Sequence, residues 1–206
     1  MESIHDLPHL LKLYPSLVGL NVTIPYKEQV LEYLDDIDES AKEIGAVNTI
    51  KIKNKKLIGY NTDVYGFEQS LLPSIPVNSL PNALILGTGG AAKAVAYVLT
   101  KLGITFKYVS RQKRENVLTY DELNQNTMEN YHIIVNTSPL GMYPNIDQAP
   151  NIPYDFASEK HLFYDLVYNP EKTLFLNKGK EKGATIINGH KMLILQAEKS
   201  WEIWTR

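Results

Sequence analysis

After residue 81 the sequence alternates short apolar runs with amphipathic helical patterns, and this alternation limits the fold more than any other feature. We expect strands at residues 83–86, 105–109, 133–135, 162–166 and 184–187, and a helix at residues 91–102 that Gly103 ends. Parallel strands need long crossover connections, so strands that alternate with helices form a parallel sheet covered on both faces. The pattern therefore predicts an α/β fold for this part of the chain.

The residues before this alternation form a separate, mixed α/β pattern. We expect a strand at residues 17–23 and short helices at 27–34 and 38–44, where Asp38 suits the N-cap and Gly45 the end of the second helix. Period-two runs at 47–52 and 57–61 flank Asn54-Lys55, which predicts a hairpin, and Asp63 begins the next helix.

Three prolines within residues 73–81 interrupt any regular element, so we place a domain boundary there. A last helix is expected at residues 191–204, with an apolar side made of Leu193, Ile194, Ala197, Trp201 and Trp204. The expected parts are residues 1–75, 76–187 and 188–206, the last being a helix that packs back on the first part.

A glycine-rich turn follows the first strand of the alternating region and opens its helix. The run is Gly87-Thr88-Gly89-Gly90-Ala91-Ala92. Gly87 permits a tight turn, Gly89 lets the backbone approach a pyrophosphate, and Ala92 still allows close packing of helix on strand. The N-terminus of the helix offers free N–H groups to phosphates. The run predicts a Rossmann-type dinucleotide site, and the alternative is a glycine turn that serves packing alone.

The end of the second strand indicates which dinucleotide binds. An NAD site usually places an acidic residue there, about 20 residues past the glycines, to bind the ribose 2′-hydroxyl. Here Ser110 and Arg111 begin a run with three cations, and no acidic residue occurs before Glu115. Because a guanidinium grips phosphate in a forked geometry, the run favours the 2′-phosphate of NADP(H) over a merely solvated basic loop.

Composition excludes several classes of protein. The 21 basic and 23 acidic residues give a net charge of −2, which offers no strong field for a nucleic-acid partner. Cysteine is absent, and the five histidines show no spacing typical of metal ligands, so we expect no metal. No apolar run reaches the roughly 20 residues of a membrane-spanning helix, and the first six residues do not suit a secretory signal. We expect a cytoplasmic protein with a small-molecule substrate, as a monomer or homodimer.

Six motifs, together with the glycine turn, carry a family resemblance by their fixed order. Besides the glycine turn they are NVTIPYK from Asn21, GAVNT from Gly45, GYNTD from Gly59, DLVYNP from Asp165 and NGHKMLILQA from Asn188, with NTSPLGM from Asn136 between them. In this set the sequence resembles the shikimate dehydrogenase family, from about Gly19 to the C-terminal helix. The resemblance implies an NADPH-dependent, reversible reduction of 3-dehydroshikimate to shikimate, in the pathway to chorismate and the aromatic amino acids.

The same resemblance implies roles for individual residues. Lys27 and Asp63 correspond to the catalytic pair, although taken alone they would more often be a surface lysine and a helix N-cap. A ketone that receives hydride develops alkoxide charge, and an ammonium held by a carboxylate can supply both cation and proton.

The substrate contacts that the resemblance implies are Thr23, Asn48, Tyr168 and Gln196. Without the resemblance, each of these four residues has an ordinary structural role: Thr23 as a strand residue, Asn48 as a turn former, Tyr168 in core packing and Gln196 at a solvated helix position. Leu166 and Gly189 match positions that line the nicotinamide, and Thr137 follows a strand end where the cofactor should cross.

The sequence departs from the family pattern at its beginning. A strand, a Gly-x-Pro segment and a Ser-x-Ser pair that binds the substrate carboxylate normally precede the NVT motif, whereas residues 5–13 suggest the helix before the second strand. About the first forty residues of the pattern have no counterpart, which would expose a strand edge and an apolar face. We therefore expect NADP binding with slow or no turnover. The alternatives are a quinate/shikimate dehydrogenase, which Arg111 disfavours, and a non-catalytic NADP-binding module.

Overall fold

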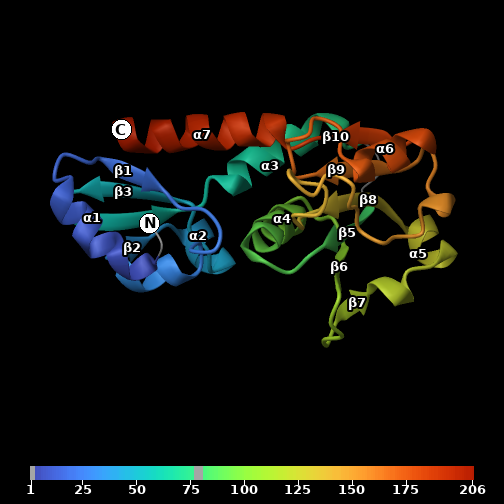
Figure 1. Ribbon diagram of the computed structural model, residues 1–206, viewed down its shortest axis with the longest axis horizontal. Coiled ribbons are helices and arrows are strands. Elements are labelled where there is room, and N and C mark those ends of the chain that lie inside the picture. The colour runs from blue at the N-terminus through green and yellow to red at the C-terminus, as the bar shows by residue number, and fades with distance from the viewer. Residues whose placement is uncertain (1–2, 77–80) are drawn as a thin grey trace.

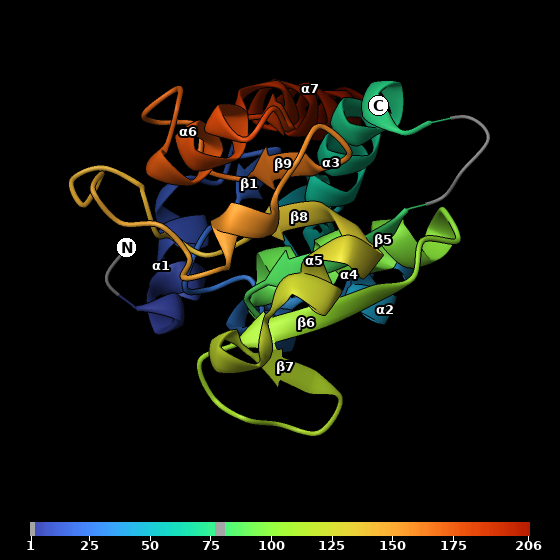
Figure 2. The same cartoon turned by 90° about the vertical axis from the view of Figure 1, so that its right-hand side faces the viewer.

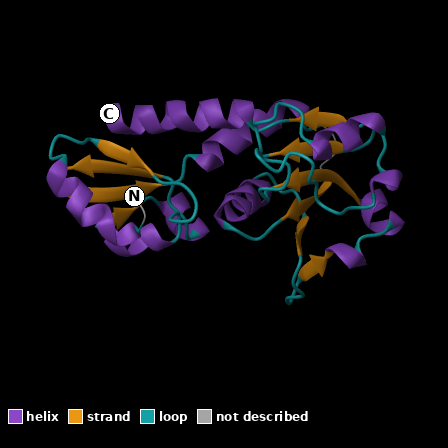
Figure 3. Ribbon diagram, viewed as in Figure 1, coloured by secondary structure: helices purple, strands orange, loops and turns teal. Residues whose placement is uncertain are grey.

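The computed structural model describes residues 3–76 and 81–206, and its strands form two separate sheets (Figures 1 and 3). A four-stranded sheet lies in the N-terminal part and a six-stranded sheet in the C-terminal part. Two helices, α3 (Asp63–Leu71) and α7 (His190–Thr205), lie between and along them. The expected α/β fold with two sheets is confirmed.

The N-terminal sheet has the order β1-β3-β4-β2, with β1 at Gly19–Asn21, β2 at Asp36–Ile37, β3 at Thr49–Lys53 and β4 at Lys56–Tyr60. β3 and β4 form the expected hairpin, and both turn residues, Asn54 and Lys55, have positive φ. The expected strand at 17–23 is shorter, because only Gly19–Asn21 find partners on β3. β1 is an edge strand of this sheet, and a largely apolar cavity of about 320 Å³ lies beside it.

Short helices cover this sheet, and one of them differs from the expectation. The elements are η1 (Ile4–Asp6), α1 (Leu7–Leu13) and α2 (Glu39–Ile44), which Asp38 caps and Gly45 ends with φ of 69°. The expected helix at 27–34 is instead a 3-10 helix, η2 (Gln29–Tyr33), which buries Val30. Lys27 therefore lies in the turn before η2 and not on a helix.

The six strands of the C-terminal sheet are all parallel, in the order β10-β9-β8-β5-β6-β7, and Figure 2 shows this sheet from β9 to β7. The strands are β5 (Asn82–Leu86), β6 (Phe106–Ser110), β7 (Val117–Thr119), β8 (Tyr131–Asn136), β9 (Leu162–Asp165) and β10 (Thr185–Ile187). Helices α4 (Gly90–Lys101), α5 (Gln125–Asn130) and α6 (Leu174–Glu181) cross between them. β5 pairs with both β6 and β8, so strands are added first on one side of β5 and then on the other. In folds of this kind, ligands bind at the point where the strand order reverses in this way.

Helix α7 connects the two sheets, but the side that it buries is not the expected one. Leu193, Ile194 and Trp201 are exposed, whereas Met192 and Ser200 are buried. The apolar periodicity was a poor guide here because α7 packs on α3 and on polar groups of β3 rather than on an aliphatic sheet face. Trp204 is the exception, since its Nε1 donates to the Ile50 carbonyl.

The segment between the two parts includes η3 (Leu72–Ser74). Residues 77–80 of the expected linker lie outside the described residues. The boundary at residues 75 and 76, and the separate assignment of residues 188–206, stay predictions.

Candidate active site

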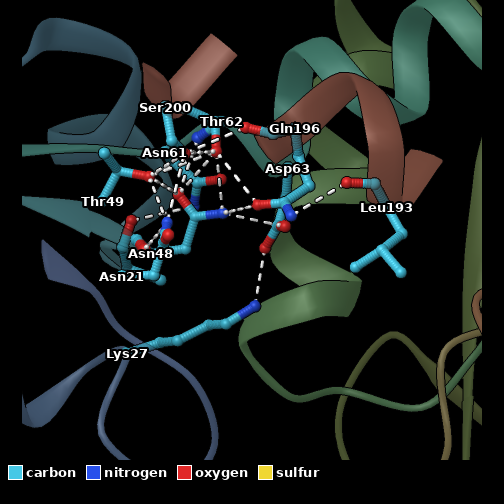
Figure 4. Close-up of polar contacts among 11 residues, drawn as sticks. Asn21, Lys27, Asn48, Thr49, Asn61, Thr62, Asp63, Leu193, Gln196 and Ser200 are labelled. Carbon is cyan, nitrogen blue, oxygen red and sulfur yellow. Dashed lines mark hydrogen bonds and ion pairs between the residues drawn. The ribbon is translucent and has the colours of Figure 1, made fainter. Parts of the chain in front are cut away.

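Lys27 and Asp63 form an ion pair with 2.7 Å between Nζ and Oδ2 (Figure 4). Lys27 lies in the turn after β1, and its backbone carbonyl accepts from the Val47 N–H at 2.8 Å, which fixes the turn against the segment before β3. Asp63 is the first residue of α3, directly after β4 and Thr62. The side chains are 17% and 9% exposed, so the pair is shielded yet accessible. The N-cap residue of α3 is Thr62 and not Asp63.

The side-chain amide of Asn48 holds the other oxygen of Asp63. Its Nδ2 donates to Asp63 Oδ1 at 2.9 Å, while its Oδ1 accepts from the Thr62 backbone N–H at 2.7 Å. Asn48 is 3% exposed, which is why it is not a mere turn former. Asp63 thus receives one charged and one neutral donor, on different oxygens, and its carboxylate plane is fixed.

A cavity of about 370 Å³ opens over this pair, between the two sheets. It is lined by both residues of the expected catalytic pair and by all four expected substrate contacts, Thr23, Asn48, Tyr168 and Gln196. Tyr168 is 48% exposed, so its side chain is not part of the core. Residues more than 140 positions apart in the sequence meet here because α7 lies along α3, where Gly66 lets the two helices approach closely.

Gly87 and its neighbours form the turn between β5 and α4 with the geometry that the glycine motif predicts. Gly87 has φ of 126°, and a Cβ there would lie 2.5 Å from Thr137 Oγ1. A Cβ on Gly89 would meet open space, and Gly89 and Gly90 begin α4 without a side-chain cap. The free N–H groups of this helix start fit the phosphates of a dinucleotide.

Two further expected cofactor residues approach from β9 and the start of α7. A Cβ on Gly189 would collide with the Leu166 carbonyl oxygen, so only glycine fits beside this strand end. Leu166, Gly189 and Ala91 line the cavity over the ion pair. Thr137 lines an adjoining cavity of about 360 Å³ that shares Ala91, Leu166 and Tyr168 with the first. The two cavities connect the carboxyl ends of β8 and β9 to the Lys27–Asp63 pair.

The basic run after β6 is less uniform than its sequence indicates. Lys113 forms an ion pair with Glu122, so it does not offer a free cation as we expected. Arg111 is exposed, and Arg111 and Arg114 make no ion pair within residues 3–76 and 81–206. Ser110 Oγ accepts from the Gln112 N–H at 3.2 Å. Ser110 and Arg111 thus remain at the strand end where a 2′-phosphate would lie.

The sequence pattern did not single out one buried acid near the site. Asp165, at the end of β9, accepts from Thr173 Oγ1 at 2.5 Å, Asn136 Nδ2 at 2.9 Å and the Val167 N–H at 3.0 Å. Burial raises the pKa of its carboxyl to about 6, against these hydrogen bonds, which lower it. Its position as the first residue of the DLVYNP motif was the available signal.

Among the described residues, no group of histidine and acidic side chains is arranged to hold a metal ion. Nor does any helix within this part of the chain have the length and apolarity to cross a membrane.

The parallel sheet has a glycine turn at the point where its strand order reverses, and this turn faces an ammonium–carboxylate pair across a cleft. Together these features define a dinucleotide-dependent oxidoreductase of two-sheet architecture. Residues 2–50 match the family model described as shikimate dehydrogenase substrate binding domain. The chain is 46% identical to the shikimate dehydrogenase (NADP(+)) of Methanococcus aeolicus, over 91% of this chain and 72% of that protein. The corresponding protein of Clostridium beijerinckii is 43% identical, over 98% of this chain and 77% of its own length.

The solved structures agree with these relatives. The shikimate 5-dehydrogenase of Thermus thermophilus, in complex with NADP(H) and shikimate, superposes with a TM-score of 0.86 at 31% identity, covering 98% of this chain and 79% of that one. The chain belongs to the shikimate dehydrogenase family.

Proposed function

We propose that this chain catalyses the reversible reduction of 3-dehydroshikimate to shikimate with NADP(H), at the low rate expected above, and that Lys27 and Asp63 are its catalytic pair. The observation that carries the proposal is the 2.7 Å ion pair at the floor of a cavity of about 370 Å³. The relatives of the same family, named as NADP(+)-dependent shikimate dehydrogenases, support the choice of substrate and cofactor.

Lys27 has the geometry of a proton donor to a ketone oxygen. When the ketone carbon gains hydride, its carbonyl oxygen becomes an alkoxide and takes a proton from the Lys27 ammonium, so that a C–H bond and an O–H bond form. Asp63 holds the ammonium in place by its Oδ2 and stabilises its charge beforehand. In the reverse direction the neutral amine accepts the proton of the alcohol.

Polar groups around the cavity suit a ring with several hydroxyls and a carboxylate. Thr23, Asn48, Tyr168 and Gln196 offer hydroxyl and amide groups from different elements. Because an unmatched buried polar group costs about 1–3 kcal/mol, such a set selects for substrates whose hydroxyls match it.

The chain's own residues fit NADP(H). The Gly87–Gly90 turn and the N-terminus of α4 would hold the pyrophosphate, Ser110 and Arg111 the 2′-phosphate, and Ala91, Thr137, Leu166 and Gly189 the nicotinamide end. When bound, the cofactor supplies or accepts the hydride.

The test is a steady-state assay with shikimate and NADP⁺, and with 3-dehydroshikimate and NADPH. Lys27→Met should lower kcat by about 10²–10⁴-fold and leave NADPH binding unchanged, because general acid–base catalysis contributes a factor of this size. The matched control is Lys101→Met, which removes a lysine from an ion pair with Glu68 at 2.8 Å outside the cavity and should retain activity.

Three outcomes would overturn the proposal. Wild-type turnover by Lys27→Met would show that Lys27 is not the proton donor. Oxidation of quinate as efficient as that of shikimate would indicate a quinate/shikimate dehydrogenase instead. NADPH binding without turnover of any of these substrates would indicate a non-catalytic NADP-binding module.

A further inference from the structure

We infer that Ser200 on α7 is a positioning residue: through Thr49 and Thr62 it fixes the side-chain amide of Asn48, and thereby the carboxylate of Asp63. The inference rests on the proposed role of the Lys27–Asp63 pair. Ser200 lies outside the set of cavity-lining residues and is 0% exposed, so it acts on the site through other side chains.

The orientation of the Asn48 amide decides whether it supports or repels Asp63. The Thr62 backbone N–H can only donate, and it lies 2.7 Å from one terminal atom of this amide, which must therefore be the oxygen. The nitrogen then faces Asp63 Oδ1 at 2.9 Å. In the flipped orientation the amide oxygen would face a carboxylate oxygen, and Asp63 would lose a donor.

The hydroxyls of Thr49 and Thr62 contact this amide, and Ser200 connects the two. Ser200 Oγ lies 2.8 Å from Thr49 Oγ1 and 3.1 Å from Thr62 Oγ1, and it donates to the Gln196 carbonyl at 2.9 Å (Figure 4). Because each hydroxyl has one proton, Ser200 can accept from the two threonines. Asn21 Nδ2 also lies within hydrogen-bond distance of Ser200 Oγ, at 3.2 Å, so that Asn21 and the two threonines share the two lone pairs of this oxygen.

The cluster brings together elements that are far apart in sequence. Thr49 begins β3, Thr62 precedes α3, Asn21 ends β1 and Ser200 lies on α7. Thr49 and Thr62 are 0% and 2% exposed, so bulk water does not replace a lost partner. Without the Ser200 hydroxyl, both threonines would turn toward the remaining acceptors, which include Asn48 Oδ1 and Gln196 Oε1. The geometry around Asn48 would change although every residue that lines the cavity is retained.

The first experiment compares Ser200→Ala with Ser70→Ala in the whole chain. Ser70 is the matched control, because it is also a buried helical serine that donates to the carbonyl four residues earlier, at 2.7 Å, but it contacts Tyr164 rather than the Asn48 cluster. Ser200→Ala should lower kcat by about tenfold or more, since a displacement of about 1 Å can cost about 10²-fold in rate. NADPH affinity should stay unchanged, and Ser70→Ala should keep wild-type kcat.

A second pair of variants separates the hydroxyl from the shape of the side chain. Thr49→Val removes the hydroxyl and Thr49→Ser retains it, so kcat should fall only in Thr49→Val. This pair also decides the question if Ser200→Ala does not fold.

A readout that needs no substrate distinguishes failure of this inference from failure of the proposed function. The rate at which trinitrobenzenesulfonate modifies Lys27, followed by mass spectrometry, reports how firmly Asp63 holds the ammonium. Ser200→Ala should raise this rate at least severalfold relative to Ser70→Ala. Equal rates of Lys27 modification, or equal kcat values, in Ser200→Ala and Ser70→Ala would overturn the inference. An inactive wild-type chain would refute the proposed function and leave the labelling comparison decisive.

Discussion

Asp63 shows how the site is built at the scale of single residues. Its two oxygens serve different partners, Lys27 Nζ at 2.7 Å and Asn48 Nδ2 at 2.9 Å. Both partners come from turns next to strands of the N-terminal sheet, so the carboxylate is oriented by the backbone of that sheet. A carboxylate held this way offers a fixed site for an ammonium, which is what a positioned proton donor requires.

Arg111 leads to a prediction about cofactor choice. Arg111→Ala should weaken NADPH binding by roughly 10- to 100-fold and leave NADH binding unchanged, because a hydrogen bond to a charged group contributes about 1.5–3 kcal/mol. Equilibrium titration of cofactor fluorescence measures both affinities. Lys113→Ala is the control, since Lys113 is already paired with Glu122 and should change neither affinity by more than a small factor. Equal losses for NADPH and NADH in Arg111→Ala would contradict a role at the 2′-phosphate.

At the scale of elements, the contact between α3 and α7 determines the site. α3 carries Asp63 at its start, and α7 carries Gln196 and Ser200, so the distance between these helices sets the distance between their side chains. A Cβ on Gly66 of α3 would lie 2.6 Å from the Met192 carbonyl oxygen and 3.1 Å from Gln196 Cβ. The glycine therefore permits an approach that no other residue would allow.

Gly66→Ala is expected to destabilise the protein by about 1–3 kcal/mol, as overpacking of a close contact does, although alanine is otherwise the better helix former. Urea unfolding followed by circular dichroism measures the free energy of unfolding. Gly89→Ala is the control for stability, because a Cβ there meets open space. Equal stability of Gly66→Ala and the wild-type protein would show that α3 and α7 can separate without cost.

At the scale of the whole molecule, the buried carboxyl of Asp165 connects folding to pH. Its partners belong to three segments, the end of β8, the loop after β9 and the residue that caps α6. Burial raises its pKa from 3.8 to about 6 in the folded protein. The folded state therefore binds the proton more tightly than the unfolded chain, and this contribution to stability is present at low pH and lost as the pH rises through about 6.

Asp165→Asn should accordingly remove this loss of stability with rising pH. Relative to wild type, the variant should gain stability between pH 4 and pH 7, by an amount on the order of 3 kcal/mol, from 1.36 kcal/mol per pKa unit. Urea melts of both proteins across this range test the difference, which cancels the opposite contributions of Glu122, Asp155 and Glu202, whose pKa values are lowered. Parallel curves for the two proteins would contradict the assignment.

Much of the local structure of this protein, and the chemical groups of its site, follow from the amino-acid sequence. Alternation of apolar runs and helices predicted the parallel sheet, Asn54-Lys55 the hairpin, and Gly87 the tight turn, because each depends on neighbours only a few residues away. The motifs around Lys27, Asp63 and Gln196 identified residues that line one cavity, although spacing alone could not have brought them together.

Which side chains meet, and which faces are buried, depends instead on tertiary packing. Packing placed Ser200 rather than Trp201 inside and paired Lys113 with Glu122. It also shortened the expected strand at 17–23 to Gly19–Asn21 and left the expected helix at 27–34 as a 3-10 helix at Gln29–Tyr33. These outcomes depend on the close approach of α3 and α7 and on which backbone groups find partners across the sheets. The contacts between α3 and α7 join residues more than a hundred positions apart, and local propensity carries no information about them.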